Sequence, residues 1–291
     1  MGGSARRRTP RPGRARKRPS VRRSGLLSLS QHITARDVQI LHLIREHRFL
    51  DIHQLTDVFF DSYSVARRRM LILSTELEVV DRFRPRVYRG SSPFHYVLAE
   101  AGARIIAADR GIEYRDLRFR TEDLDGLPWN PKRRHTSATN SFFAKLIRTC
   151  RSHPPYAVLE WINEASCKQR WPETAEPDGF CYMETPVGPI CFAVEIDRGT
   201  ESPGKVAAKL LRYASLALAE AKPDLLAFSF PDPERETAVR KRLYPVRGLY
   251  TVTTSVDRHE QDPIGNNWLP IGSETRLSFG DLARLVSKET A

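Results

Sequence analysis

Apolar residues recur at helical spacing near the start of the chain, from Thr34 onward. Thr34 can cap a helix from its side chain, with Asp37 at the third helical position. The apolar stripe that follows consists of Val38, Leu41 and Ile44. Because residues three and four apart share one helix face, this pattern predicts a first helix of about a dozen residues.

The pattern predicts five further helices and strands, and one turn, before residue 110. They are a short helix capped by Asp51, a turn at 61–64, a third helix over 65–77, strands at 79–86 and 93–98, and a helix at 99–109. Three helices, a hairpin and a closing helix are the order of a winged helix-turn-helix domain.

After residue 134 the pattern alternates between helices and strands. We expect a helix over 135–150, a strand at 157–162, a hairpin ending in the buried run 190–194, a helix at 202–221, a strand at 225–230, a helix at 233–243 and a strand at 248–253. This order predicts an α/β domain with a mixed central sheet, and an α+β or α/β fold for the whole chain.

Changes in composition divide the chain into five predicted parts. Gly126, Pro128 and Pro131 prevent a long helix in the charged stretch between the two folded units. The parts are a basic tail at 1–30, a winged-helix domain at 31–120, a linker at 121–134, the second domain at 135–275 and a C-terminal helix or tail at 276–291.

Positive charge is concentrated at the N-terminus. Of the 47 Lys and Arg residues, ten lie within residues 1–24, which hold no acid, so 37 remain against 35 Asp and Glu. A segment rich in Pro, Gly and Arg cannot bury apolar surface, and we expect it to be disordered. It is expected to attract nucleic-acid phosphate non-specifically, with an affinity that weakens as salt rises.

Two classes of protein are disfavoured by the composition. No apolar run is long enough to cross a membrane, and the basic N-terminus lacks the apolar region of a secretory signal. The cysteines show no CxxC pairing and lie in or beside apolar segments. This favours a cytoplasmic protein with reduced, buried thiols over a zinc site or a disulfide framework.

The third predicted helix opens with three arginines. In a helix-turn-helix, the first part of this recognition helix enters the major groove of duplex DNA, and wing arginines face the backbone. The predicted DNA-binding residues are Ser62, Ser64, Arg67, Arg68, Arg69, Arg82, Arg84, Arg86 and Arg89. The alternative is a small helical domain for dimerisation or protein contact, whose arginines are merely solvated.

Three acids are expected to meet at one edge of the second domain. Glu195 and Asp197 are two apart on a strand and project to the same face, and the hairpin register brings Asp178 alongside. Crowded carboxylates repel one another, and Mg²⁺ or Mn²⁺ relieves this, with Asp178 and Glu195 as the predicted metal ligands. The alternative is that Arg198, Lys205 and Lys209 neutralise the acids in surface ion pairs.

The element order, with Pro177-Asp178 and the pair Glu195-x-Asp197, resembles the core of the PD-(D/E)XK nuclease superfamily. The resemblance implies acids that hold Mg²⁺ and a lysine that orients the nucleophile. Here Asp197 stands where that lysine belongs, and Lys209, two turns into the next helix, is the expected replacement. The implied catalytic residues are Asp178, Glu195, Asp197 and Lys209, with His135 and Asn140 facing the site. An inactive nuclease fold retained for DNA binding is the alternative.

Over nearly its whole folded length, the chain resembles the replication-relaxation family of plasmids and integrative elements. The motifs that carry this are Thr34-x-Arg36-Asp37-x-x-Ile40-Leu41, Gln54-Leu55, His135, Pro177-Asp178-Gly179, Glu195-Ile196-Asp197-Arg198-Gly199-Thr200-Glu201 and Lys209-Leu210-x-x-Tyr213. The resemblance implies a role in the replication and DNA relaxation of mobile elements, beside a relaxase or a replication initiator.

Three functions therefore stay open. The first is a DNA-binding protein of a plasmid or integrative element, with double-stranded DNA, a relaxase or initiator and a second copy of the chain as expected partners. The second is a metal-dependent endonuclease that nicks DNA through Asp178, Glu195 and Asp197. The third is a winged-helix transcriptional regulator whose C-terminal domain is not catalytic.

Overall fold

A computed structural model describes residues 31–85, 87, 90–121, 126–171, 175–216 and 223–290. The predicted basic tail lies outside these residues. Helices and a mixed six-stranded sheet occur together, so the predicted α+β or α/β fold class is confirmed.

The N-terminal part has the predicted order of elements, with one short strand added. These are α2 (Ala35–Glu46), β1 (Leu50–Asp51), α3 (Ile52–Phe59), α4 (Tyr63–Thr75), β2 (Val80–Phe83), β3 (His95–Leu98) and α5 (Glu100–Asp109). The three strands form an antiparallel sheet in the order β1-β3-β2. Strand β1 was not predicted, because two residues carry no alternation of their own and owe their strand geometry to pairing with β3.

Side-chain caps fix where these helices begin. Thr34 caps α2 as predicted and forms a capping box with Asp37, and Asp51 caps α3 together with Gln54. The predicted start of the third helix was two residues late. Ser62 Oγ accepts a hydrogen bond from the Val65 amide, so the helix already begins at Tyr63 and includes the second half of the predicted turn.

The C-terminal part adds α8, α11 and β9 to the predicted order. After the 3₁₀ turns η1 (Tyr114–Leu117) and η2 (Leu127–Trp129) come α7 (Arg133–Ser152), β4 (Ala157–Asn163), α8 (Glu164–Arg170), β5 (Gly179–Thr185), β6 (Gly188–Ile196), α9 (Pro203–Leu216), β7 (Leu225–Phe230), α10 (Pro233–Arg240), β8 (Tyr250–Ser255), α11 (Val256–His259), β9 (Leu269–Pro270) and α12 (Phe279–Thr290).

The six strands pair in the order β4-β5-β6-β7-β8-β9. Strands β6, β7 and β8 are parallel, and the remaining pairings are antiparallel. Helices α7 and α12 cover one face, where Phe142, Phe192 and Phe279 pack together. Helices α9 and α10 cover the other, so this part has three layers.

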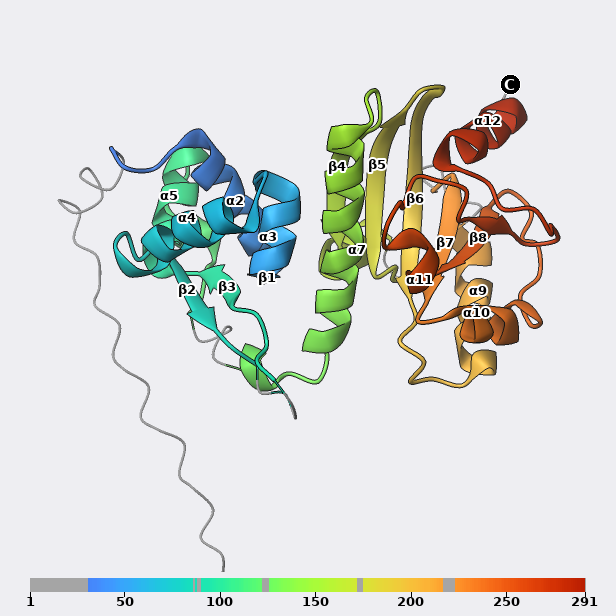
Figure 1. The fold of residues 1–291 in the computed structure, drawn as a ribbon, viewed down its shortest axis with the longest axis horizontal. Helices are drawn as coiled ribbons and strands as arrows, with labels where there is room; N and C mark the ends of the chain where they lie inside the picture. Colours follow the sequence, from blue (N-terminus) through green and yellow to red (C-terminus); the bar gives the residue numbers. More distant parts are fainter. Residues whose placement is uncertain are drawn as a thin grey trace, which may run out of the picture.

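Helix α7 stands between the N-terminal helices and the large sheet (Figure 1). Its Asn140 donates to the Phe49 carbonyl over 2.8 Å, and its Ser141 accepts from Gln54 over 2.9 Å. Beside it, the His47 ring stacks on Trp161 with centroids 3.5 Å apart. One apolar core therefore continues from the N-terminal helices into the sheet, and the division into two domains stays a prediction.

Candidate functional site

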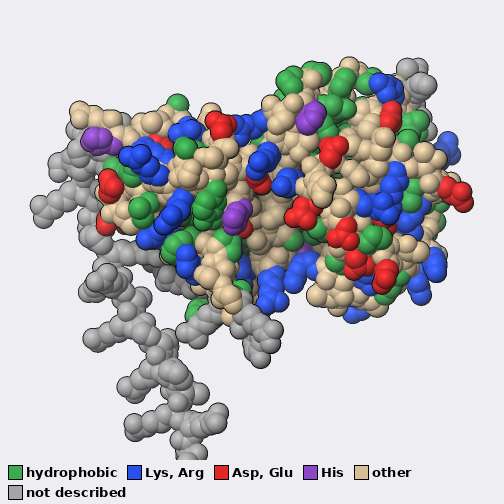
Figure 2. Space-filling model, viewed as in Figure 1, with side chains coloured by type: hydrophobic (Ala, Val, Ile, Leu, Met, Phe, Trp, Pro, Cys, Tyr) green, Lys and Arg blue, Asp and Glu red, His purple; other side chains and the backbone are tan. Residues whose placement is uncertain are grey.

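Two groups of predicted site residues lie in different places, and the first is on the start of α4. Arg67 and Arg68 are exposed there, one turn after the exposed Tyr63. Ser62 caps the helix and its hydroxyl also contacts that of Ser64 at 3.1 Å. Figure 2 shows several Lys and Arg side chains over the N-terminal elements, with some Asp and Glu side chains among them.

Arg69 is placed differently from its neighbours. Its Nε donates to Asp37 Oδ1 over 2.9 Å, and its Nη2 donates to the His32 carbonyl over 2.8 Å. Burial alone would raise the pKa of Asp37, but the bonds from Arg69 and Thr34 hold it below its usual value. Arg69 therefore joins α4 to the start of α2, rather than extending toward a ligand with Arg67 and Arg68.

The β2–β3 hairpin places two more arginines beside α4. The guanidinium groups of Arg82 and Arg84 lie 4.5 Å and 3.9 Å from the centre of the Phe94 ring. Together with Tyr63 and Arg67 they line a groove of about 310 Å³ between α4 and the hairpin. Arg86 and Arg89, which were also predicted to bind DNA, lie outside the described residues.

The second group is the acidic pair Asp178 and Glu195, at the end of the β5–β6 hairpin. The register pairs Gly179 with Val194, so Asp178 lies opposite Glu195. The Asp178 amide donates to the Val194 carbonyl over 3.0 Å, and its carboxylate accepts from the Ile196 amide over 2.7 Å. The prediction that the hairpin brings these two acids together is confirmed.

Glu195 is buried, with a side chain only 5 % exposed, and is held by two groups of α9. Lys209 Nζ donates to Oε2 over 2.8 Å, and the Tyr213 hydroxyl donates to Oε1 over 2.6 Å. Burial and the nearby Asp178 raise the pKa of Glu195 to about 7, although Lys209 opposes this. For Lys209, burial favours loss of the proton, but the Glu195 carboxylate outweighs it and raises the pKa above its usual value.

Asp178 has a histidine partner on α7. His135 Nε2 lies 2.7 Å from Asp178 Oδ1, and this hydrogen bond raises the pKa of His135 against the opposing effect of burial. His135 therefore faces the acids as expected. Asn140, which was expected there too, instead bonds to the Phe49 carbonyl.

Asp197 does not join the other two acids, which corrects the expected convergence of three carboxylates. Arg235 Nε of α10 donates to Asp197 Oδ2 over 2.6 Å, and Oδ1 accepts from the Gly199 amide over 2.9 Å. Strand β6 ends at Ile196, so the alternation of faces stops before Asp197. Within the described ranges, no group of three or more His, Cys, Asp or Glu could hold a metal ion.

Sequence reasoning gave no role to Tyr213 or Arg235. A signal for Tyr213 was available, because Lys209 and Tyr213 are four residues apart in a helix and so share a face. The sequence contained no signal for the role of Arg235, since its contact with Asp197 depends on how α10 packs beside the end of β6.

Two predictions about the chain's general character were also tested. The four cysteines are free, and Cys150, Cys167 and Cys181 are buried as expected, whereas Cys191 is half-buried. Burial raises the pKa of the Cys150 thiol to about 12, which makes it unreactive.

Across the described stretches, every helix is too short or too polar to pass through a bilayer.

Comparison with known families gives one match. The family model described as replication-relaxation matches residues 41–228, a range that contains α4, the hairpin and the acidic pair. Neither curated proteins nor solved structures give a match.

Proposed function

The chain belongs to the replication-relaxation family, and we propose that it serves a plasmid or integrative element by binding duplex DNA beside a relaxase or a replication initiator. Membership supports the broader role in replication or relaxation of such an element. Duplex binding, the protein partner and pairing with a second copy are the parts that we add.

The observation that carries the proposal is the set of exposed arginines on α4 and the hairpin. Arg67 and Arg68 lie near the start of the third helix, where a recognition helix meets base edges and phosphates. Arg82 and Arg84 extend the charge along β2 and the residue that follows it. The order of elements supports a winged helix, in which helix and wing contact the same duplex. The role of Arg69 in joining α2 and α4 removes it from this set.

We expect the double variant Arg67→Ala, Arg68→Ala to bind duplex DNA more weakly by about 1 to 3 kcal/mol, because base or phosphate contacts are lost. A gel-shift titration with a mixed pool of duplexes measures this. The matched control is Arg212→Ala with Arg247→Ala, two exposed arginines of the C-terminal part. Equal affinity of wild type and the α4 variant would remove the recognition helix from the proposal.

A second candidate function, a metal-dependent endonuclease, is favoured by the position of Lys209. Mg²⁺ commonly takes one or two protein carboxylates and completes its shell with water and substrate phosphates, and Asp178 and Glu195 fit that number. A bound Mg²⁺ or Mn²⁺ would polarise a phosphate and a water molecule there. Lys209 would then hold the position of the motif lysine, and Asp197 would orient Arg235 rather than bind metal.

Supercoiled plasmid tests this candidate. With Mg²⁺ or Mn²⁺, wild type is expected to convert supercoils to open circles, and Glu195→Gln is expected to stop this by removing a metal ligand. Metal binding by calorimetry is the independent readout. Intact supercoils at high protein concentration, together with no metal binding, would exclude the endonuclease and leave duplex binding as the function.

A further inference from the structure

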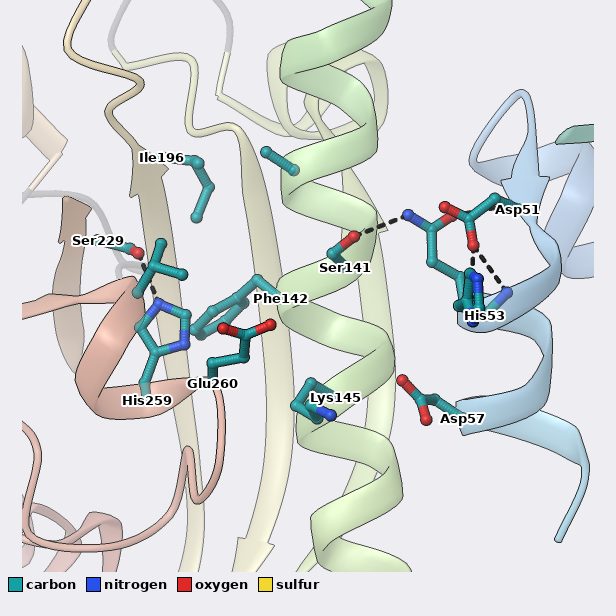
Figure 3. A pocket seen from close by; sticks show the side chains of 13 residues that line it. Asp51, His53, Asp57, Ser141, Phe142, Lys145, Ile196, Ser229, His259 and Glu260 are labelled. Carbon is teal, nitrogen blue, oxygen red and sulfur yellow. Dashed lines mark hydrogen bonds between the residues drawn. The ribbon is translucent and has the colours of Figure 1, made fainter. Parts of the chain in front are cut away.

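A cavity of about 340 Å³ lies where the N-terminal helices meet the large sheet (Figure 3), and neither acid of the pair Asp178 and Glu195 lines it. Its walls come from α3, α7 and α11, and from the ends of β6 and β7. Ile196 is the last residue of β6, Ser229 is near the end of β7, and Val256 follows β8. The carboxyl ends of parallel strands and the contacts between structural units are both common ligand sites.

Two opposite charges in this cavity have no protein partner. Among the described residues, no ion pair or hydrogen bond joins the side chain of Lys145 or of Glu260 to another group. Asp57 is different, because Arg148 donates to its carboxylate over 2.6 Å. In Figure 3, Lys145 on α7 lies between Asp57 of α3 and Glu260, the residue that follows α11. One free cation and one free carboxylate therefore border the same space.

Most of the remaining lining is apolar or hydrogen-bonded within the protein, and the His53 ring stacks on Tyr63. Phe142, Ile196 and Val256 supply apolar surface. Ser229 and His259 bond to each other at 2.8 Å, and Ser141 accepts from Gln54. Burial lowers the pKa of His259 to about 4, so its ring is neutral near pH 7 and adds no charge. A matching ligand has one negative group, one positive group and an apolar body.

We propose that this cavity binds a small zwitterion, an apolar α-amino acid, whose carboxylate pairs with Lys145 and whose ammonium pairs with Glu260. The side chain of the ligand lies against Phe142 and Ile196. A cavity of this volume accommodates an aromatic amino acid, and the single charges of opposite sign disfavour a simple organic acid or amine.

The site has a physical route to the DNA-binding face. His53 lines both this cavity and the groove between α4 and the hairpin. Its ring stacks on Tyr63, the first residue of α4, with centroids 5.3 Å apart. A ligand that moves His53 therefore moves the start of α4 as well. This consequence, unlike the binding site itself, rests on the proposed DNA-binding function.

The test uses L-phenylalanine and two analogues that each lack one charge, 3-phenylpropionate and phenethylamine, without DNA. At ten times its Kd, phenylalanine is expected to raise the Tm of the full chain by about 3 °C. Each analogue is expected to bind about tenfold more weakly, because one charge-assisted hydrogen bond is lost. Calorimetry gives the Kd values.

Two variants test which cavity residue binds which charged group of the ligand. Lys145→Met is expected to weaken phenylalanine binding about tenfold and to leave phenethylamine unchanged, since that analogue has no carboxylate to lose. Glu260→Gln is also expected to weaken phenylalanine binding about tenfold. It is expected to leave 3-phenylpropionate binding unchanged, since that analogue has no ammonium group to lose. Lys241→Met, at an exposed lysine outside the cavity, is the control. The proposal is overturned if wild type does not bind phenylalanine, if either analogue binds as tightly, or if both cavity variants bind phenylalanine like wild type.

A separate arm measures the coupling. Saturating phenylalanine is expected to change duplex affinity by about fivefold or more, and duplex is expected to change phenylalanine affinity by the same factor. Unchanged affinities would overturn the His53–Tyr63 route and leave the binding site standing. If duplex binding itself fails, the titrations without DNA still decide whether the site exists.

Discussion

Replacing Lys209 with Met is expected to lower the free energy of unfolding by about 2 to 4 kcal/mol at pH 8, because it leaves a buried carboxylate without its cation. The Glu195 side chain is 5 % exposed, and Lys209 is the base that contacts it. Since the lysine is itself 34 % exposed, the loss is smaller than for a fully buried pair. Urea denaturation measures the change.

The pH dependence of the stability loss in Lys209→Met shows whether the buried charge of Glu195 causes it. The pKa of Glu195 is already raised to about 7 by burial and Asp178, and removing Lys209 raises it further. The folded variant then binds more protons than the unfolded chain at pH values above the ordinary glutamate pKa, so its stability falls as pH rises through this window. We expect a small defect at pH 5 and the full defect at pH 8.

Two controls separate this charge effect from lost packing. Lys205→Met, at an exposed position of α9, is expected to be neutral. Adding Glu195→Gln to Lys209→Met is expected to restore much of the stability at pH 8, because the buried charge is gone. An equal defect at pH 5 and pH 8, with no recovery in the double variant, would show that Lys209 acts through packing.

Arg69→Ala is expected to destabilise the fold by about 3 kcal/mol, because Asp37 is completely buried and loses its bond to the guanidinium. The pKa of Asp37 is held below its usual value by Arg69 and Thr34, so the pair stabilises the fold above the ordinary aspartate pKa. This contribution is lost as pH falls through the lowered pKa. Thermal and urea unfolding at pH 7 measure it.

The neighbouring arginine provides the comparison. Arg68→Ala, at an exposed position of α4, is expected to change stability by less than about 0.5 kcal/mol. The two variants thus separate an arginine that holds α2 and α4 together from one that is available to a ligand. A stable Arg69→Ala protein whose only defect is in DNA binding would contradict the assignment.

Local signals in the sequence predicted most elements, since the caps Thr34 and Asp51 and the apolar periodicity act over a few residues. The elements that were not predicted depend on pairing with distant residues or are very short. Strand β1 exists because β3 pairs with it, and α8 is a seven-residue helix opened by an Asn163 cap. Elements of these two kinds contain too few residues of hydrophobic periodicity to be predicted from the sequence.

The candidate site divides in the same way. The meeting of Asp178 with Glu195 was predictable from hairpin register, and Lys209 followed from two helical turns. The position of Asp197 was predicted wrongly, because strand alternation was extended one residue beyond the end of β6. There, Arg235 donates a hydrogen bond to the Asp197 carboxylate. The same limit applied to Arg69, whose partner Asp37 lies 32 positions earlier in the chain.

The salt dependence of duplex binding tests the central claim most directly. Fluorescence anisotropy would give the affinity of wild type and of Arg67→Ala, Arg68→Ala at a series of salt concentrations. Each lost phosphate contact reduces the slope of log K against log salt by about one, so the variant is expected to lose about one to two units of slope along with affinity. Identical slopes and affinities in the two proteins would contradict duplex binding through α4.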